Sequence, residues 1–191
     1  SPLFFDKLKP EVKWASPSSG VVTSIHFGAR RIIEKIEISV EDKKPESYKS
    51  FSSTELNAAD REAVMKNILD ACIFPLIRQR PFNKVANPND VPRDIFVSAY
   101  NTAPLSVNVS KVIQNNKDQF QAGLTALSKL TDGSVYLTSQ KPMEFDNVTN
   151  VTIEGPHPAG NVSVQMQKHL PINNCLCARG AISKQISSIS V

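Results

Sequence analysis

The sequence contains few cysteines and no long apolar run. Its three cysteines are too few for a disulfide framework, which fits a chain kept in a reducing cytosol. The longest uncharged apolar stretch, Ala71–Ile77, is far shorter than the ~20 residues of a membrane helix, so a membrane span is excluded. The chain opens at Ser1 with a strand-like segment in place of a secretory signal, and we expect it to be part of a longer protein.

Motifs for common cofactors are also missing. There is no Gly-x-Gly-x-x-Gly and no Walker A sequence, so glycines that cradle a phosphate are absent. No group of His and Cys residues has iron–sulfur spacing, and Cys175 and Cys177 supply only two of the four ligands of structural zinc. We interpret these two cysteines as incidental thiols and expect no cofactor in this chain.

The charge balance is mildly basic, with 22 Lys and Arg against 18 Asp and Glu, a net charge of +4. The charges are scattered along the sequence, which argues against a nucleic-acid partner. A basic face next to an anionic membrane surface or an acidic partner subunit remains open. The 191 residues, 40% of them hydrophobic, are enough for a domain with a real core.

The first forty residues have the pattern of β-structure. Val21–Ile25 is a β-branched run, and Arg31–Val40 is the longest expected strand. In the strand Arg31–Val40, apolar residues at 36, 38 and 40 alternate with polar ones, which predicts one buried and one solvent-exposed face. The charged stretch 41–53 is typical of a linker. We therefore expect a β-domain over residues 1–44, a linker over 45–56 and a further domain over 57–191, with an atypical tail at 171–191.

After the linker, helical and strand patterns alternate. The first helix is expected from about Asn57, its N-cap, to Phe74, with Cys72 on its buried stripe. The second is expected from Val109 to Leu130, followed by a C-terminal Gly133. Short apolar strands are expected at 94–99, 135–138 and 148–154. Strands and helices in this order predict a right-handed βαβ unit and a Rossmann-like α/β domain.

The first candidate site is the loop Gly155-Pro156-His157-Pro158-Ala159-Gly160, which directly follows an expected strand. Open α/β sheets bind ligands at the ends of their strands. The prolines stiffen such a loop, and the glycines allow close approach or a positive φ. His157 could contact a ligand oxygen, although no carboxylate partner for proton transfer is identifiable. The alternative is a structural turn with an exposed histidine.

The second candidate is Arg78-Gln79-Arg80-Pro81-Phe82, at the expected exit of the first helix. Arg78 and Arg80 could clamp an anion or the carboxylates of another subunit. The alternative, which we favour, is that they cap the helix. The β-domain could also have been a biotin or lipoyl carrier, which presents a lysine for covalent attachment in a hairpin turn. No lysine lies between Lys13 and Lys35, which argues against such an attachment.

Five segments, taken together and in this order, resemble the A subunit of the sodium-translocating NADH:quinone reductase, a bacterial respiratory complex. The resemblance covers roughly residues 3 to 170, and the Gly-Pro-His-Pro-Ala-Gly loop is its most distinctive part. The segments are 14–22 with 28–31, 78–82, 95–99 with 101–105, 121–124 with 127–131, and 155–160.

The resemblance implies a Rossmann-like α/β domain, similar to the flavin-binding subunit of respiratory complex I, preceded by part of a biotinyl/lipoyl-like β-domain. It implies a peripheral subunit on the cytoplasmic face of the bacterial inner membrane, docked on other subunits of a complex that couples electron transfer to sodium export. NADH, flavins and the iron–sulfur centre would belong to those partner subunits. The residues near a quinone or a partner would be Gly155, Pro156, His157, Pro158, Gly160, Arg78 and Arg80.

The sequence departs from the family at both ends. By this resemblance the β-domain would be only half present, and residues 171–191 do not align, so we expect the fragment alone to be inactive. Two alternatives stay open. One is a free-standing α/β domain that binds a small molecule without catalysis. The other is a related electron-transport protein that passes ferredoxin electrons to NAD, which should carry Cys-x-x-Cys-x-x-Cys motifs that this sequence lacks.

Overall fold

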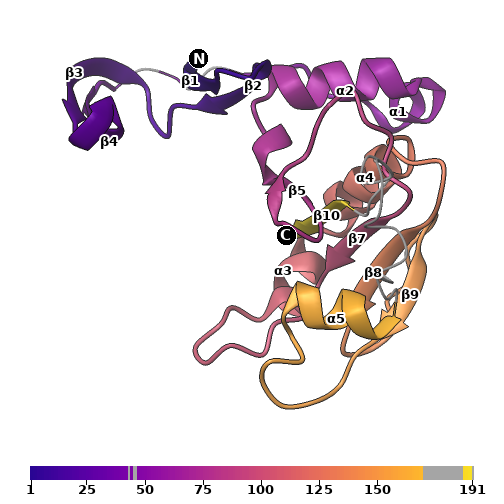
Figure 1. Cartoon of the computed structure of the whole chain (residues 1–191). Coiled ribbons are helices and arrows are strands. Elements are labelled where there is room, and N and C mark those ends of the chain that lie inside the picture. Colours follow the sequence, from indigo (N-terminus) through magenta and orange to yellow (C-terminus); the bar gives the residue numbers. More distant parts are fainter. Residues whose placement is uncertain (43, 45–46, 170–186, 191) are drawn as a thin grey trace, which may run out of the picture.

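The computed structural model describes residues 1–42, 44, 47–169 and 187–190. The amino-terminal part consists of two antiparallel hairpins. Strands β1 (Pro2–Asp6) and β2 (Lys9–Ala15) form the first, and β3 (Gly20–Phe27) and β4 (Ile33–Val40) form the second. A short 3-10 turn, η1 (Ala29–Arg31), connects β3 and β4. Figure 1 shows the β3–β4 hairpin standing away from the rest of the chain.

The expectation of one buried face on the strand ending at Val40 is wrong. Residues Ile36 and Ile38 are only half-buried, and Val40 is 68% exposed. On the opposite strand, Val22 and Ile25 are also exposed. The alternating pattern does gather the apolar side chains on one side, because Val22 pairs with Ile38 and Ile25 with Ile36. Among the described residues, however, no second layer covers that side.

The rest of the chain is a mixed α/β unit built on a six-stranded sheet. Strands β7 (Ile95–Ser98), β8 (Val135–Ser139) and β9 (Thr149–Thr152) are parallel neighbours, which confirms the three strands expected there. The hairpin β5 (Ile77–Gln79) and β6 (Lys84–Val85) was not expected. Strand β10 (Ser187–Ser190), from the atypical tail, lies between β5 and β7, so the sheet order is β6-β5-β10-β7-β8-β9.

The single helix expected over Asn57–Phe74 is wrong, because two helices occupy this stretch. Helix α1 (Ser53–Ala58) ends at the extended residue Ala59, and α2 (Arg61–Asp70) begins with Asp60 as its N-cap. The Asp60 carboxylate accepts a hydrogen bond from the Ala63 N–H at 2.8 Å, and this local bond starts a new helix. The N-cap is therefore Asp60, and α1 begins inside the stretch interpreted as linker.

The second long helix is also divided. Helix α3 (Val109–Asn115) and helix α4 (Lys117–Ser128) meet at Asn116, whose backbone is not helical. Helix α5 (Val162–His169), which was not expected, follows the Gly155–Gly160 loop. Cys72 lies beyond the end of α2 with φ 57° and is half-buried, so its placement in the core of a helix is corrected. A 3-10 turn, η2 (Phe74–Leu76), leads from there into β5.

The main core lies between the sheet and helices α1, α2, α3 and α4. Val97 and Leu137 from the sheet are fully buried there against Leu124 of α4. Val12 of β2 is buried in the same core, so the first hairpin packs on this unit, in contact with α2 and η2. Helix α5 covers the other face, where Met166 packs on Phe96. The sheet therefore separates two layers of helices, as in Figure 1.

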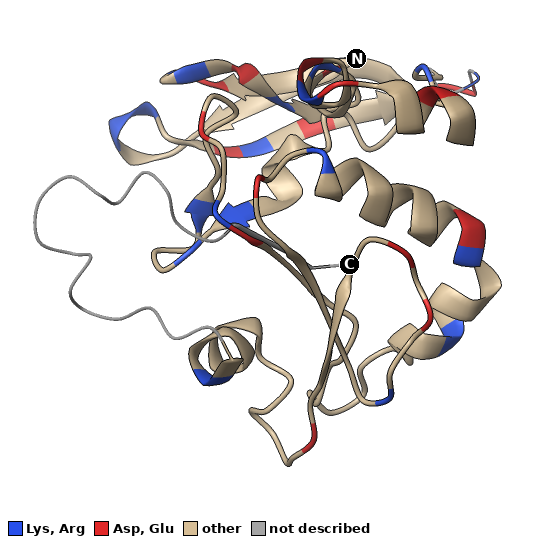
Figure 2. Cartoon of the chain, turned by 90° about the vertical axis from the view of Figure 1, so that its right-hand side faces the viewer, with Lys and Arg blue, Asp and Glu red and all other residues tan. Residues whose placement is uncertain are grey.

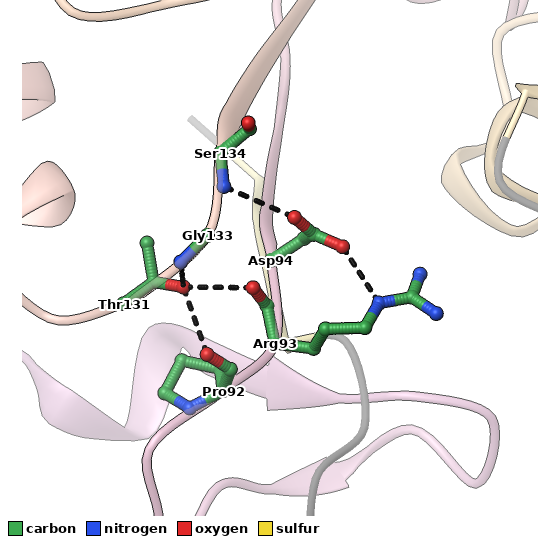
Figure 3. Close-up of polar contacts among 6 residues, drawn as sticks. All are labelled: Pro92, Arg93, Asp94, Thr131, Gly133 and Ser134. Carbon is green, nitrogen blue, oxygen red and sulfur yellow. Dashed lines mark hydrogen bonds and ion pairs between the residues drawn. The ribbon is translucent and has the colours of Figure 1, made fainter.

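A polar cluster fixes the register of β7 and β8 at their amino ends (Figure 3). The Asp94 carboxylate accepts a hydrogen bond from the Ser134 N–H at 3.0 Å, and the Thr131 hydroxyl bonds the Pro92 carbonyl at 2.8 Å. A Cβ on Gly133 would lie 1.9 Å from the Arg93 carbonyl oxygen. Gly133 is thus required because the chain passes close to β7 at this point. The expectation that it terminates the second helix is wrong, because α4 already ends at Ser128.

Candidate functional site

The two motifs singled out in the sequence meet in space. Arg80 directly follows β5, and its Nη1 donates a hydrogen bond of 2.9 Å to the Ser163 hydroxyl. Ser163 lies in the first turn of α5, three residues after the Gly155–Gly160 loop. The structure thereby joins segments that are 83 residues apart in sequence.

A polar groove of about 390 Å³ lies where these segments meet. We call it the polar groove; it is lined by Arg80, Ser98, Tyr100, Asn101, Val109 and residues 160–164. Ser98 is the last residue of β7, so the groove lies at the carboxyl end of a parallel strand. This is the edge at which α/β sheets bind their ligands.

Thr102 holds the Gly155–Gly160 loop in place. Its hydroxyl oxygen accepts a hydrogen bond from the Gly160 N–H at 2.9 Å and lies 3.2 Å from Nδ1 of His157. Because the Thr102 hydrogen is not needed for the Gly160 bond, it can be donated to Nδ1, which favours the tautomer of His157 with its hydrogen on Nε2. His157 is exposed and would then present an N–H donor to solvent.

The two glycines of the loop serve different purposes. Gly160 is buried, and a Cβ there would lie 2.3 Å from the Thr102 backbone nitrogen. Gly155 has φ 145°, a conformation that side chains disfavour. Among the described residues, the side-chain partner of His157 is a hydroxyl, so the carboxylate that would support proton transfer is not part of this arrangement.

The two arginines differ in their surroundings. Arg78 lies within β5 and donates to the Asn83 carbonyl of the β5–β6 hairpin, so the expectation that it caps a helix is wrong. The reason is that α2 ends at Asp70 and the chain has already entered the sheet at Ile77. Arg80 is half-buried on the polar groove. Burial, and then the neighbouring charge of Arg78, lower the pKa of Arg80.

A buried polar cluster beneath the groove was missed by the sequence analysis. Gln165 of α5 is 1% exposed, and its Oε1 accepts hydrogen bonds from the hydroxyls of Thr138 at 2.8 Å and Ser98 at 3.2 Å. The Gln165 Nε2 has no hydrogen-bond partner among the described residues. The available signal was the hydroxyl residues Ser98 and Thr138 within buried strands. Their partner in α5 could not be predicted because the sequence analysis did not predict helix α5.

An apolar groove of about 450 Å³ lies on the opposite face of the sheet. Val97 lines the apolar groove while Ser98, the next residue of β7, lines the polar groove, because successive side chains of a strand point to opposite faces. The helices contribute the other walls, among them Ile68, Leu76, Val112, Phe120 and Leu127.

A structural metal site needs several ligating side chains gathered in one place. In the described part of the chain, no group of three or more His, Cys, Asp and Glu side chains is placed to hold a metal ion. Cys175 and Cys177 lie outside the described residues. None of the helices described here has the length and hydropathy to cross a membrane. In Figure 2, Lys and Arg are interspersed with Asp and Glu along the ribbon.

Two family models match the chain. The model described as the NqrA N-terminal barrel-sandwich hybrid domain matches residues 1–41, and the one described as the NqrA second alpha/beta domain matches residues 59–177. The second match alone covers more than half of the chain.

Curated relatives agree with these models. The chain is 36% identical over 176 residues to a protein of Saccharophagus degradans, and 37% identical over 162 residues to one of Psychromonas ingrahamii. Each of the two is named as the A subunit of a Na(+)-translocating NADH-quinone reductase. These alignments cover 90% and 83% of this chain but only 39% and 36% of the relatives, so the chain spans about two fifths of their length. The chain belongs to the NqrA family, the A subunits of the Na(+)-translocating NADH-quinone reductases.

Proposed function

We propose that this chain acts as a non-catalytic part of the A subunit in a sodium-translocating NADH-quinone reductase. One observation carries the proposal: two consecutive domain models of that subunit match the chain in order, over residues 1–41 and 59–177. The role is architectural, in which the mixed α/β unit docks on other subunits and supports respiratory electron transfer coupled to sodium export. We infer a Rossmann-like ancestry for the parallel strands β7, β8 and β9.

The sequence supports an architectural rather than a redox role. In doubly wound folds, the turn after the first strand carries the glycines that approach a pyrophosphate. Here the segment after β7 is Tyr100-Asn101-Thr102-Ala103-Pro104, which contains no glycine. NADH, flavins and the iron–sulfur centre accordingly belong, in this proposal, to partner subunits. The small number of cysteines suits a peripheral position on the cytoplasmic face of the inner membrane.

The loop Gly155–Gly160 is the part of the chain that we assign to a partner subunit or a quinone. It is largely exposed, and Thr102 and Gly160 fix its position. In the tautomer favoured by Thr102, His157 offers an N–H donor, which matches a quinone carbonyl or a partner's carbonyl oxygen. Arg80 adds a cationic donor nearby on the polar groove.

Crosslinking in the assembled complex tests this function. A tagged, full-length version of the protein, with a photoreactive amino acid in place of His157, would be produced with the other subunits and purified from detergent-solubilised membranes. We expect the other subunits to co-purify and to crosslink at this position. A matched variant with the photoreactive group at the exposed residue Asp132, at the amino ends of the sheet strands, is the control.

Two outcomes would contradict the proposal. If the tagged protein elutes alone, membership of a complex fails and the alternative of a free-standing small-molecule binding domain gains support. If the complex forms but positions 157 and 132 crosslink equally little, the architectural role stands while the assignment of the loop to an interface fails.

A further inference from the structure

The polar groove combines a cation with backbone and side-chain hydrogen-bond donors. Arg80 is the only charged side chain among the described residues that line it. Its guanidinium is positioned over the first turn of α5 by the 2.9 Å bond to the Ser163 hydroxyl. A half-buried guanidinium next to a second cation, Arg78, has lost part of its hydration and gains more from a bound anion than an arginine in open solvent does.

The start of α5 faces the same groove. The N–H groups of Val164 and Gln165 both bond to the Asn161 carbonyl, and the Asn161 N–H bonds to the Pro158 carbonyl. The N–H groups of Val162 and Ser163, between them, have no backbone or side-chain acceptor in the described part of the chain. The first turn of α5 holds no acidic residue, whereas Lys168 and His169 occupy its last turn. The positive end of the helix dipole is therefore uncompensated at the groove.

A third unpaired donor is buried beside the groove, in a residue that bonds Ser98 of its lining. The Nε2 amide of Gln165 is buried and has no partner in the described part of the molecule, while its Oε1 is already engaged by Ser98, which lines the groove. Buried donors without a partner are rare in proteins and disfavour ligands that bring further donors. The two backbone N–H groups and the guanidinium line the groove and favour a ligand rich in acceptors, and the buried Gln165 amide beside them adds to the surplus of donors.

We propose that the polar groove binds an oxyanion, either the phosphate group of a small molecule or a carboxylate. The Val162 and Ser163 N–H groups and the Arg80 guanidinium would contact its oxygens. At about 390 Å³ the groove accommodates a larger molecule that carries such a group. This site does not depend on assembly into a reductase, because every contributing residue belongs to this chain.

Titration of the 191-residue chain with inorganic phosphate tests the site. The amide NMR signals of Val162 and Ser163 would be followed at constant ionic strength, with sodium chloride replaced stepwise by sodium phosphate. We expect saturable shifts of these two signals. A parallel titration with sodium acetate distinguishes the sources: stronger binding of phosphate indicates a phosphorylated small molecule, and stronger binding of acetate indicates a carboxylate group.

Three variants make the test decisive. Arg80→Gln removes the charge, and we expect it to weaken phosphate binding at least about tenfold. Arg31→Gln, at an exposed arginine of the β3–β4 connection, is the matched control and should bind like the parent. Ser163→Ala keeps the charge but removes the bond that orients the guanidinium, and should weaken binding by a smaller factor. Shifts that do not saturate, or that are equal in Arg80→Gln and Arg31→Gln, would show only general anion screening and overturn the proposal. Thermal unfolding of each variant checks that it is folded.

Discussion

At the scale of single residues, Gly160 determines whether the candidate loop can reach its position. Its N–H bonds the Thr102 hydroxyl, and the Thr102 backbone passes so close that no side chain fits between them. The contrast within the same protein is Gly123 of α4, around which nothing lies within 4 Å of an added Cβ. The same substitution therefore meets opposite environments at the two positions.

We predict that Gly160→Ala destabilises the protein by about 1–3 kcal/mol, because the Thr102 backbone must move. Gly123→Ala should stabilise it by up to about 1 kcal/mol, because alanine is the better helix former and meets no obstacle. Urea denaturation of both variants measures the difference. Equal unfolding free energies for the two variants would show that the loop is not held against Thr102.

The residues of the candidate site were predictable individually, but their arrangement was not. Gly155–Gly160 and Arg80 stood out by residue type, since prolines, glycines and arginines restrict or enable particular geometries. The hydrogen bond from Arg80 to Ser163 joins positions 83 residues apart and forms only because β5 enters the sheet. A strand of three residues leaves little signal in the sequence, so this entry could not be predicted. Gln165 carried no signal at all, because a glutamine in a short polar helix resembles a surface residue.

At the scale of elements, local capping decides where the helices begin. The apolar spacing over residues 57–74 fits one continuous helix, yet the Asp60 carboxylate binds the Ala63 N–H and divides it. The strands β7, β8 and β9 were easier to predict, because short β-branched or apolar runs between loops have few alternatives. Strands β5, β6 and β10 are two to four residues long and exist through their neighbours in the sheet.

We predict that Asp60→Ala costs about 1 kcal/mol of unfolding free energy, the usual effect of losing an N-cap. Asn57→Ala should have little effect, because Asn57 lies inside α1 and caps nothing there. Chemical denaturation followed by far-UV circular dichroism compares the two. A larger loss of unfolding free energy for Asn57→Ala than for Asp60→Ala would instead support the single helix that the sequence pattern favours.

The β3–β4 hairpin contains a carboxyl group with a strongly shifted pKa. Hydrogen bonds from Lys35, and then from Ser24 and His26, lower the pKa of Glu37 from 4.5 to about 2. Because the pKa is lower in the folded hairpin, the ionised carboxylate stabilises the hairpin above pH 4.5, and this contribution is lost as the pH falls from about 4.5 to about 2. The Glu37 side chain is 41% exposed, so salt reduces the effect.

NMR titration of the Glu37 side chain measures this shift directly. We predict that Lys35→Gln moves the pKa of Glu37 back towards 4.5, because Lys35 is its largest cause. His26→Asn should move it less. An unchanged pKa in Lys35→Gln would mean that the Lys35–Glu37 pair does not form in solution.

At the scale of the whole molecule, the amino-terminal hairpins differ in how they join the rest. β2 contributes Val12 to the main core, and Lys9 donates hydrogen bonds to the carbonyls of Val85 and Ala86. The β3–β4 hairpin shares none of these contacts and keeps its apolar side exposed. The alternation of apolar residues predicted that side correctly, but a sequence pattern cannot reveal whether another layer covers it.

We predict that Val12→Ala, at a residue with no exposed surface, costs about 2 kcal/mol, because the variant loses buried methyl groups and leaves a cavity. Val40→Ala, at a residue 68% exposed, should change the unfolding free energy by less than about 0.5 kcal/mol. Thermal and urea unfolding of the pair tests this. Comparable losses would show that the β3–β4 hairpin is buried in solution.

The β3–β4 hairpin has unpaired strand edges and an exposed apolar side, so strands of other chains can pair with it. Aggregation through such pairing requires two molecules to meet. The fraction of aggregated protein therefore rises with protein concentration. We therefore expect the polypeptide to aggregate more readily when it is overproduced by itself than when a binding partner covers this side of the hairpin.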